Sequence, residues 1–237
     1  LFIMILIAKH FHLERTLACG QAFRFKPVKD GWWFGVVGDK PLLVRQKGDA
    51  LELLSPCEDE AFWTRYFSLD RDYGEVEAML SADPKTAPAI ACSAGMRILR
   101  QDPYETLISF VLSQNNNVKR IAGIIERLCE ACGEKDVFMG IEYFAFPACE
   151  ALAEATVREL EGLGTGYRAP YVIDCARKIR DGYDLNALKS LPFEQAKREL
   201  MTFRGVGPKV AECVMLFSLG FDTAFPVDVW VKRISAW

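Results

Sequence analysis

The feature that most constrains the fold is a change of pattern along the chain near residue 89. Before it, short runs rich in aromatic and β-branched residues, such as Trp32–Val37, alternate with turn residues and predict short antiparallel strands. After it, apolar residues recur at helical spacing, as they do over 103–114. We therefore expect an α+β protein, with a small antiparallel sheet domain over 1–88 and an all-helical domain over 89–237.

Local periodicity and turn residues predict the individual elements. The apolar run Leu1–Ala8 lacks a cationic start and is too short to span a bilayer, so we expect a buried strand there and no membrane association. The last residues, Val229–Trp237, resemble the opening of a helix that is cut off, so we expect a fragment incomplete at its C-terminus. The helices expected from apolar spacing cover 58–67, 103–114, 117–132, 153–160, 167–180 and 193–201.

Composition narrows the class of protein. Hydrophobic residues make up 51% and charged residues 26% of the 237 residues, which excludes a disordered or fibrous chain. The 29 Lys and Arg against 32 Asp and Glu give a net charge of −3, so any nucleic-acid site must be a local patch. The eight cysteines are not spaced as a disulfide framework and no secretory signal is present, which predicts reduced thiols in an intracellular protein.

Two of these thiols form a C-x-x-C pair, Cys129 and Cys132. They follow apolar residues on a predicted helix, and no second Cys or His pair lies nearby. We interpret them as structural thiols and expect no metal site built from side chains.

The stretch Phe203–Cys213 contains a Gly-Val-Gly turn between two predicted helices. Pro208 falls where the first turn of a new helix tolerates proline. Such a turn presents backbone N–H groups and a positive helix end, an arrangement that suits a phosphate. On its own, however, the Gly-x-Gly pattern fits an ordinary corner between helices.

A second motif follows at the right distance. Asp228 lies in Pro-Val-Asp, nineteen residues after Lys209, and just before a new apolar run. Taken singly, Asp228 predicts an N-cap and Lys209 a solvated lysine. Together, the Gly-Val-Gly-x-Lys hairpin, the apolar helix and the aspartate resemble the helix–hairpin–helix superfamily of DNA base-excision glycosylases.

Other segments resemble one family within that superfamily, the 8-oxoguanine DNA glycosylase/lyases. The segment Cys19–Phe25 is similar to its N-terminal signature, and Ser113–Asn117 to its asparagine triplet. The loop Leu163–Ala169 is similar to its wedge loop, and Cys213 to its pocket thiol. The resemblance implies a small sheet followed by a helical glycosylase domain, as the periodicity predicts independently.

The resemblance also implies a chemistry. A glycosylase flips the target nucleotide out of the duplex to reach C1′ of its sugar. Lys209 would be the nucleophile that forms a Schiff base, and Asp228 would stabilise the cationic sugar. A lysine together with an aspartate implies a bifunctional glycosylase and abasic-site lyase that acts on duplex DNA containing 8-oxoguanine opposite cytosine, as a monomer and without a required cofactor.

The family's recognition residues can be carried over position by position. Gly20 would accept the N7 hydrogen of 8-oxoguanine through its carbonyl, Cys213 would lie against a face of the base, and Pro226 would line the pocket. Lys209 and Cys213, at i and i+4, share one helix face. The resemblance implies DNA contacts by Asn115, Arg120 and Arg168 with the orphaned cytosine, by Tyr167 as a wedge, and by Gly205, Gly207, Val210 and Trp230 with the backbone.

Several alternatives remain open on sequence. By themselves, the asparagines fit a helix cap, and Arg120 and Arg168 fit surface arginines. Trp230 stands where the family usually has a histidine. An endonuclease III-type pyrimidine-damage lyase shares the hairpin and the aspartate, and a non-catalytic DNA-binding module would need the hairpin only. The resemblance also implies a cation held by backbone carbonyls of the hairpin, and work in the nucleoid or cytoplasm of a prokaryote or in a eukaryotic nucleus.

Overall fold

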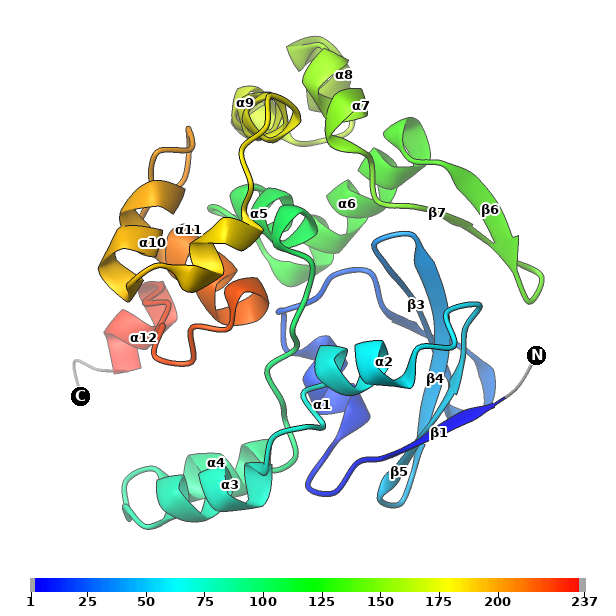
Figure 1. Cartoon of the computed structure of the whole chain (residues 1–237), viewed down its shortest axis with the longest axis vertical. Coiled ribbons are helices and arrows are strands. Elements are labelled where there is room, and N and C mark those ends of the chain that lie inside the picture. Colours follow the sequence, from blue (N-terminus) through cyan, green and yellow to red (C-terminus); the bar gives the residue numbers. More distant parts are fainter. Residues whose placement is uncertain (1–2, 235–237) are drawn as a thin grey trace. The chain divides into compact units, whose positions relative to one another are not determined.

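The computed structural model describes residues 3–234. The described chain divides into two compact units, the first ending at Arg100 and the second beginning at Gln101 (Figure 1). This division falls later than residue 88, because helix α4 (Ala87–Ser93) packs on α3 (Tyr73–Ser81) and so belongs to the first unit.

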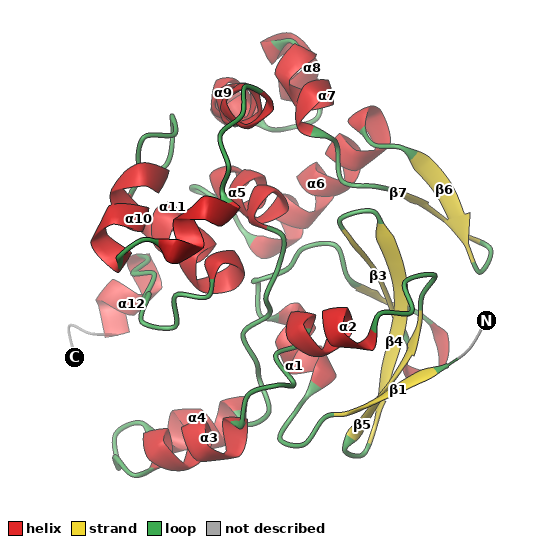
Figure 2. Cartoon of the chain, viewed as in Figure 1, coloured by secondary structure: helices red, strands yellow, loops and turns green. Residues whose placement is uncertain are grey.

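A five-stranded antiparallel sheet forms the centre of the first unit, in the order β1-β5-β4-β3-β2 (Figure 2). Leu42, Val44, Leu51 and Leu53 lie on one face of the sheet and are almost completely buried. Helices α1 and α2 contribute Leu17 and Trp63 to the same core. The described elements are β1 (Met4–Ile7), α1 (Leu13–Ala18), β2 (Lys26–Pro27), β3 (Trp33–Val37), β4 (Lys40–Lys47), β5 (Ala50–Leu54) and α2 (Glu60–Tyr66).

The first strand differs from the expectation of a buried strand. β1 pairs only with β5 and forms one edge of the sheet. Leu6 points into the core, whereas Ile5 and Ile7 are 60% and 68% exposed. An edge strand covered on one face alternates in burial whatever its composition, and this is why an all-apolar run was misleading. Residues 1 and 2 of that run lie outside the described residues.

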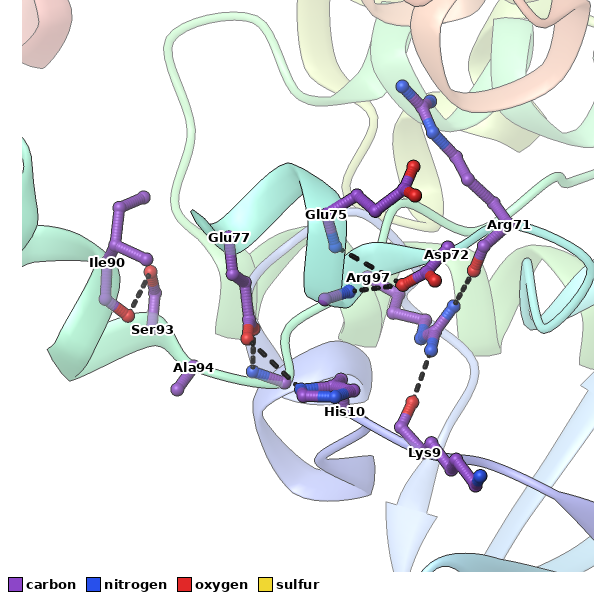
Figure 3. A network of polar contacts seen from close by, with 12 residues as sticks. Lys9, His10, Arg71, Asp72, Glu75, Glu77, Ile90, Ser93, Ala94 and Arg97 are labelled. Atoms are coloured by element: carbon purple, nitrogen blue, oxygen red, sulfur yellow. Dashed lines mark hydrogen bonds and ion pairs between the residues drawn. The ribbon is translucent and has the colours of Figure 1, made fainter. Parts of the chain in front are cut away.

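A buried arginine organises the end of the first unit (Figure 3). Arg97 donates to the carbonyls of Ser68, Arg71 and Lys9 at 2.6, 3.0 and 2.5 Å. Close by, Glu77 accepts from the Gly95 amide at 2.7 Å, which ties α3 to the chain that follows α4. Polar bonds to the backbone therefore hold together segments of the first unit that lie far apart in the sequence.

The second unit is mainly helical. The central helix α5 (Pro103–Leu112) is almost entirely buried and contacts α6, α9 and α11. Asp102 and Asn117 cap α5 and α6, respectively, through their side chains. The other helices of the described second unit are α6 (Val118–Cys132), α7 (Cys149–Glu154), α8 (Val157–Gly162), α9 (Ala169–Arg180), α10 (Phe193–Leu200), α11 (Pro208–Val214) and α12 (Val229–Ile234).

Two local expectations for this unit are wrong. It is not all-helical, because β6 (Lys135–Phe138) and β7 (Ile141–Phe144) form a hairpin. Its two-residue turn, Met139 and Gly140, has φ of +52° and +76°, the left-handed geometry that two-residue hairpins favour. The helix expected over 153–160 is two helices, since Thr156 begins α8 with a capping box. The expected helices at 58–67, 103–114, 117–132, 167–180 and 193–201 are confirmed, with ends shifted by a few residues.

None of the described helices is both long and apolar enough to cross a membrane.

Candidate active site and DNA-facing loops

A glycine hairpin joins α10 to α11, as the sequence predicts. Gly205 has φ of +81°, and a Cβ added there would lie 2.5 Å from the ring of Tyr171. Only glycine fits this turn without strain. An ion pair of 2.5 Å between Lys197 and Glu212 ties the two helices together beyond it.

The start of α11 presents unpaired amides. Gly207 is the N-cap and Pro208 the first helical residue. The first intrahelical bond runs from the Ala211 amide to the Gly207 carbonyl at 3.0 Å, so the Lys209 and Val210 amides have no acceptor within the helix. The side chain of Val210 is buried, and only its amide is available to a phosphate.

Lys209 is half-buried on the first turn of α11. Its Nζ lies 5.1 Å from the centre of the Phe110 ring on α5. That ring stacks in turn on Phe217 at 5.3 Å, in the π-helical turn Met215–Leu219 that continues α11. The aromatic pair supports the amine against the central helix. The contact of Phe110 with the amine could not be predicted from the sequence, because its helical spacing indicates only a core residue.

Cys213 brings the candidate catalytic residues together. Burial raises the pKa of its thiol to about 11; Lys209 opposes this rise by its charge and a hydrogen bond, whereas Glu212 and Asp228 add to it. Lys209 is therefore within hydrogen-bond reach of this sulfur, whereas Asp228 acts on it only through its charge. At neutral pH the thiol is protonated and presents an uncharged surface.

Asp228 begins α12, as expected of an N-cap. Its Oδ1 accepts from the amides of Trp230 and Val231 at 2.9 and 2.8 Å. These two bonds fix the carboxylate at the start of the helix. Pro226 is half-buried, and Trp230 is exposed with Arg233 over its ring at 4.9 Å. The end of the run expected as an interrupted helix, 235–237, lies outside the described residues.

The asparagine run forms the turn between α5 and α6. Asn115 is exposed and has φ of +47°, a left-handed conformation that asparagine tolerates better than most residues. Asn116 donates to the Leu112 carbonyl at 3.1 Å, and Asn117 caps α6 through the Arg120 amide at 3.0 Å. The Arg120 side chain is exposed.

In the loop before α9, the side chain of Tyr167 is exposed to solvent and that of Arg168 is buried. Tyr167 is 52% exposed, as a wedge residue would be. Arg168 is only 3% exposed, and its guanidinium donates to the carbonyls of Gln114, Asn115 and Thr165. The interpretation of Arg168 as a surface arginine is therefore wrong, and in this structure its donors are not presented to a base.

Gly20 belongs to the first unit, where it follows α1 with φ of +88°. The next residue, Gln21, is buried and donates to the carbonyls of Thr16 and Arg97 at 2.8 and 2.7 Å, while its Oε1 accepts from the Leu99 amide at 2.9 Å. Gln21 therefore anchors the Gly20 turn. This role could not be predicted with certainty from the sequence, where the only sign of it is a polar residue directly after the glycine of the turn.

The eight cysteines are free, and Cys129 is buried while Cys132 is half-buried, which fits structural thiols. Among residues 3–234, no group of three or more His, Cys, Asp or Glu side chains is arranged to hold a metal ion. A cation at the hairpin would therefore have backbone carbonyl ligands, and its binding stays a prediction.

Comparison with known families decides between the alternatives. Residues 4–107 match the N-terminal domain of 8-oxoguanine DNA glycosylase, and residues 108–237 match the HhH-GPD superfamily of base excision DNA repair proteins. The chain belongs to the 8-oxoguanine DNA glycosylase/lyase family. The match over residues 4–107 argues against the endonuclease III-type alternative, because it places the sheet unit in the 8-oxoguanine family.

Relatives within the family agree over both units. The chain is 39% identical to an N-glycosylase/DNA lyase of Saccharomyces cerevisiae over 184 residues, 72% of this chain and 49% of the relative. It is 31% identical to N-glycosylase/DNA lyase OGG1 of Arabidopsis thaliana over 236 residues, 94% of this chain and 65% of the relative. The chain thus spans about half to two thirds of the length of these relatives.

A solved structure shows the same fold. The 8-oxoguanine glycosylase/lyase of Clostridium acetobutylicum, in complex with double-stranded DNA containing cytosine opposite 8-oxoG, superposes with a TM-score of 0.90. It is 38% identical and covers 97% of this chain, which in turn covers 83% of that protein.

Proposed function

We propose that this protein is a bifunctional DNA glycosylase and abasic-site lyase that removes 8-oxoguanine opposite cytosine from duplex DNA. The observation that carries the proposal is Lys209, half-buried over Phe110 on the first turn of the hairpin helix, in a chain that also fixes Asp228 by two amide bonds at the start of the next helix, within this family's fold. The names of the relatives support the same activity.

The chemistry follows from those two side chains. Nζ of Lys209 attacks C1′ of the flipped nucleotide, the bond from C1′ to the base breaks, and the base leaves with the bonding electrons and takes up a proton. Asp228 stabilises the positive charge that develops on the sugar before the nitrogen–carbon bond is complete. The C1′–O4′ bond of the sugar ring then breaks as the nitrogen lone pair forms the C=N bond, O4′ takes up a proton, and the opened sugar is a Schiff base on Lys209.

The lyase step uses the same adduct. A proton acceptor removes a proton from C2′, and the 3′ phosphate leaves by β-elimination. Water then hydrolyses the remaining imine and frees Lys209. The half-buried position of Lys209 over Phe110 limits its exposure to bulk water. The reaction uses side chains and water, so we propose no required cofactor.

Recognition is divided among the carried-over positions. The neutral Cys213 thiol packs against the base without the cost of desolvating a charge. Gly20 supplies a carbonyl for the N7 hydrogen, and Pro226 lines the pocket. Exposed Asn115, Arg120 and Tyr167 contact the opposite strand, and the Gly205, Gly207, Val210 and Trp230 backbone region contacts phosphate. A cation on the hairpin carbonyls would add positive charge at that phosphate.

The decisive test is borohydride trapping, which reduces a lysine Schiff base to a stable adduct. We expect the wild-type protein to form an adduct with 8-oxoguanine duplexes, and Lys209→Gln to form none while still binding the duplex. Asp228→Asn slows excision but keeps the cap, since asparagine also caps well. The matched control, Lys189→Gln, removes an exposed lysine bonded to Asn186 and leaves trapping unchanged.

The same assay separates the rival functions. A thymine-glycol duplex in place of 8-oxoguanine would trap a pyrimidine-damage lyase, and a binding module would shift the duplex in a gel without any adduct. An adduct that persists in Lys209→Gln would remove the assignment of the nucleophile. We further propose that the protein acts as a monomer on cellular DNA, to be checked by sedimentation of the protein alone and on a short duplex.

A further inference from the structure

Trp230 and Arg233 form an exposed pair on α12, directly after Asp228. Trp230 is 64% exposed, and the guanidinium carbon of Arg233 lies 4.9 Å from the centre of its ring. Residues at i and i+3 share one face of a helix, so the pair occupies a single turn of α12. The bonds from the Trp230 and Val231 amides to Asp228 fix this turn relative to the carboxylate.

The charge of Arg233 is not satisfied by the part of the chain that the structure describes. Its side chain is exposed, and within residues 3–234 it contacts the indole ring but bonds no protein oxygen. Other cations of the second unit that lie over a ring each bond a protein oxygen as well; they are Arg168, Lys178, Lys197 and Arg204. Arg233 therefore presents its charge to solvent, where an external anion can reach it.

Stacking occupies only the face of a guanidinium group. Its five N–H donors lie in the plane of the group, so the edge stays available while the ring holds the face. Two donors on one edge match two oxygens of a phosphate, and the stacked side chain has less freedom to lose on binding. An indole has one N–H donor and no charge, so Trp230 alone would be a poor ligand for a phosphate.

We propose that Arg233 binds a DNA backbone phosphate beside the nucleotide on which Asp228 acts, and that Trp230 positions its guanidinium for this contact. A rise of about 1.5 Å per residue puts Arg233 about 7.5 Å along the helix from Asp228, which places the cation beside the reacting sugar and not on it. A phosphate contact of this kind supplies affinity without sequence preference. The inference rests on the proposed function, because it takes Asp228 as the residue that acts on the sugar.

The test is the salt dependence of DNA binding, measured without chemistry. The probe is a fluorescent duplex that carries a tetrahydrofuran abasic analogue opposite cytosine, which a Schiff-base lyase cannot cleave. Anisotropy titrations between about 50 and 200 mM salt give the Kd and the slope of log Kd against log salt concentration. We expect Arg233→Gln to weaken binding by about 10-fold at the lowest salt and to reduce the slope by about 0.9, the contribution of one phosphate contact.

A double-mutant cycle tests the role of Trp230. Trp230→Leu removes the aromatic face but keeps the charge of Arg233, so we expect the affinity to fall by about 2- to 5-fold while the slope is retained. Trp230→Phe keeps an aromatic face and should restore part of the affinity. In the Arg233→Gln background, Trp230→Leu should cause no further loss, because the cation that it positions is gone.

The matched control is Arg180→Gln, which removes the same charge from an exposed arginine bonded to Asp181 at 2.9 Å. We expect this control to leave both the Kd and the slope unchanged. An unchanged slope in an Arg233→Gln protein with a wild-type urea midpoint would overturn the phosphate contact. Further loss from Trp230→Leu in the Arg233→Gln background would show that the indole itself contacts DNA, and would overturn its positioning role.

Excision assays separate this inference from the proposed function. Arg233→Gln should raise the protein concentration that gives half of the maximal single-turnover rate on 8-oxoguanine duplexes and leave that maximal rate unchanged. A lower maximal rate would mean that Arg233 acts on the reacting sugar, and would overturn the backbone contact. Wild-type protein that binds the duplex with an Arg233-dependent slope but excises no 8-oxoguanine would contradict only the proposed function.

Discussion

The two units of the molecule each contain one arginine that is 3% exposed, Arg97 in the first and Arg168 in the second. Each guanidinium lies 4.4 Å from the centre of a tyrosine ring, Tyr73 or Tyr167, and donates to the carbonyls of three residues. The acceptors are Lys9, Ser68 and Arg71 around Arg97, and Gln114, Asn115 and Thr165 around Arg168.

The two arginine sites also share a strained backbone residue. Ser68 and Asn115, each held by its arginine, have φ of +51° and +47°, where residues with side chains are rare. The difference lies in the tyrosine, since Tyr73 is 8% exposed and Tyr167 is 52% exposed. The same device therefore stabilises the interior of one unit and, in the other, holds side chains at a surface. Burial and hydrogen bonding alone do not separate an arginine that supports the interior from one that holds exposed side chains in place.

The largest effect we expect is on stability, and it tests whether the two arginines are equivalent. Arg97→Gln leaves up to three carbonyls of the first unit without their donors, at about 1 kcal/mol each, so we expect a loss near 3 kcal/mol. Arg168→Gln should cost less, about 1–2 kcal/mol, because water can reach the turn that carries the exposed Asn115. Urea unfolding followed by circular dichroism measures both.

The control for this pair is an arginine in an exposed ion pair. Arg100 bonds Asp70 at 2.8 Å with both side chains more than a third exposed, and we expect Arg100→Gln to cost well under 1 kcal/mol. Equal losses for Arg97→Gln and Arg168→Gln, or a larger loss for Arg168→Gln, would break the distinction between interior and surface.

The hydrogen bonds that bury these two arginines could not be predicted from the sequence. A helix or strand is visible as a period of apolar residues, and the main helices, the sheet and the Asp228 cap were found in that way. Arg97 and Arg168 bond to carbonyls from distant segments, and no local pattern encodes such a contact. The resemblance to a family supplied Lys209, Asp228 and Cys213 together, whereas the packing of Lys209 on Phe110 required the fold.

The β6–β7 hairpin was missed for a different reason. Its turn, Met139-Gly140, is not one of the Asn-Gly or Asp-Gly pairs that usually mark two-residue turns, although Met139 adopts the same left-handed geometry. Tertiary context therefore selects that conformation against the residue's own preference. The edge position of β1 could not be predicted from its sequence either, because the order of the strands depends on the whole sheet.

An effect of intermediate size is expected on the stability at alkaline pH, through two buried thiols of the second unit. Burial raises the pKa of Cys213 to about 11 and that of Cys175 to about 12, from an ordinary value of 9.0, and both thiols lie in the second unit. The unfolded chain therefore loses these protons first. Stability from these groups is unchanged below pH 9 and falls as the pH rises from 9 toward 11.

Each thiol should contribute a loss of about 1.4 kcal/mol by pH 10, because pH 10 lies one unit above the unfolded pKa and below the folded one. Urea midpoints at pH 8 and pH 10 measure the loss. Cys213→Ala and Cys175→Ala should each remove part of this pH dependence, whatever pH-independent change in stability the substitution itself causes. A wild-type midpoint that is the same at both pH values would show that water reaches these sulfurs. Unchanged pH dependence in both alanine variants would place the alkaline sensitivity elsewhere.

The smallest effect concerns the two tyrosine hydroxyls and tests the comparison most directly. The buried hydroxyl of Tyr73 accepts from the Ile98 amide at 3.0 Å, so Tyr73→Phe leaves that N–H without its partner and costs about 1 kcal/mol. The Tyr167 hydroxyl donates to the Gln114 carbonyl at 3.4 Å, but Arg168 donates to the same oxygen. Tyr167→Phe should therefore change stability by less than about 0.5 kcal/mol, the usual range for a surface substitution, and should keep excision intact because the ring remains. Thermal and urea unfolding of the two variants, with excision assays on Tyr167→Phe, would check both. A loss of 1 kcal/mol in Tyr167→Phe would mean that its hydroxyl, and not only Arg168, holds the turn between α5 and α6.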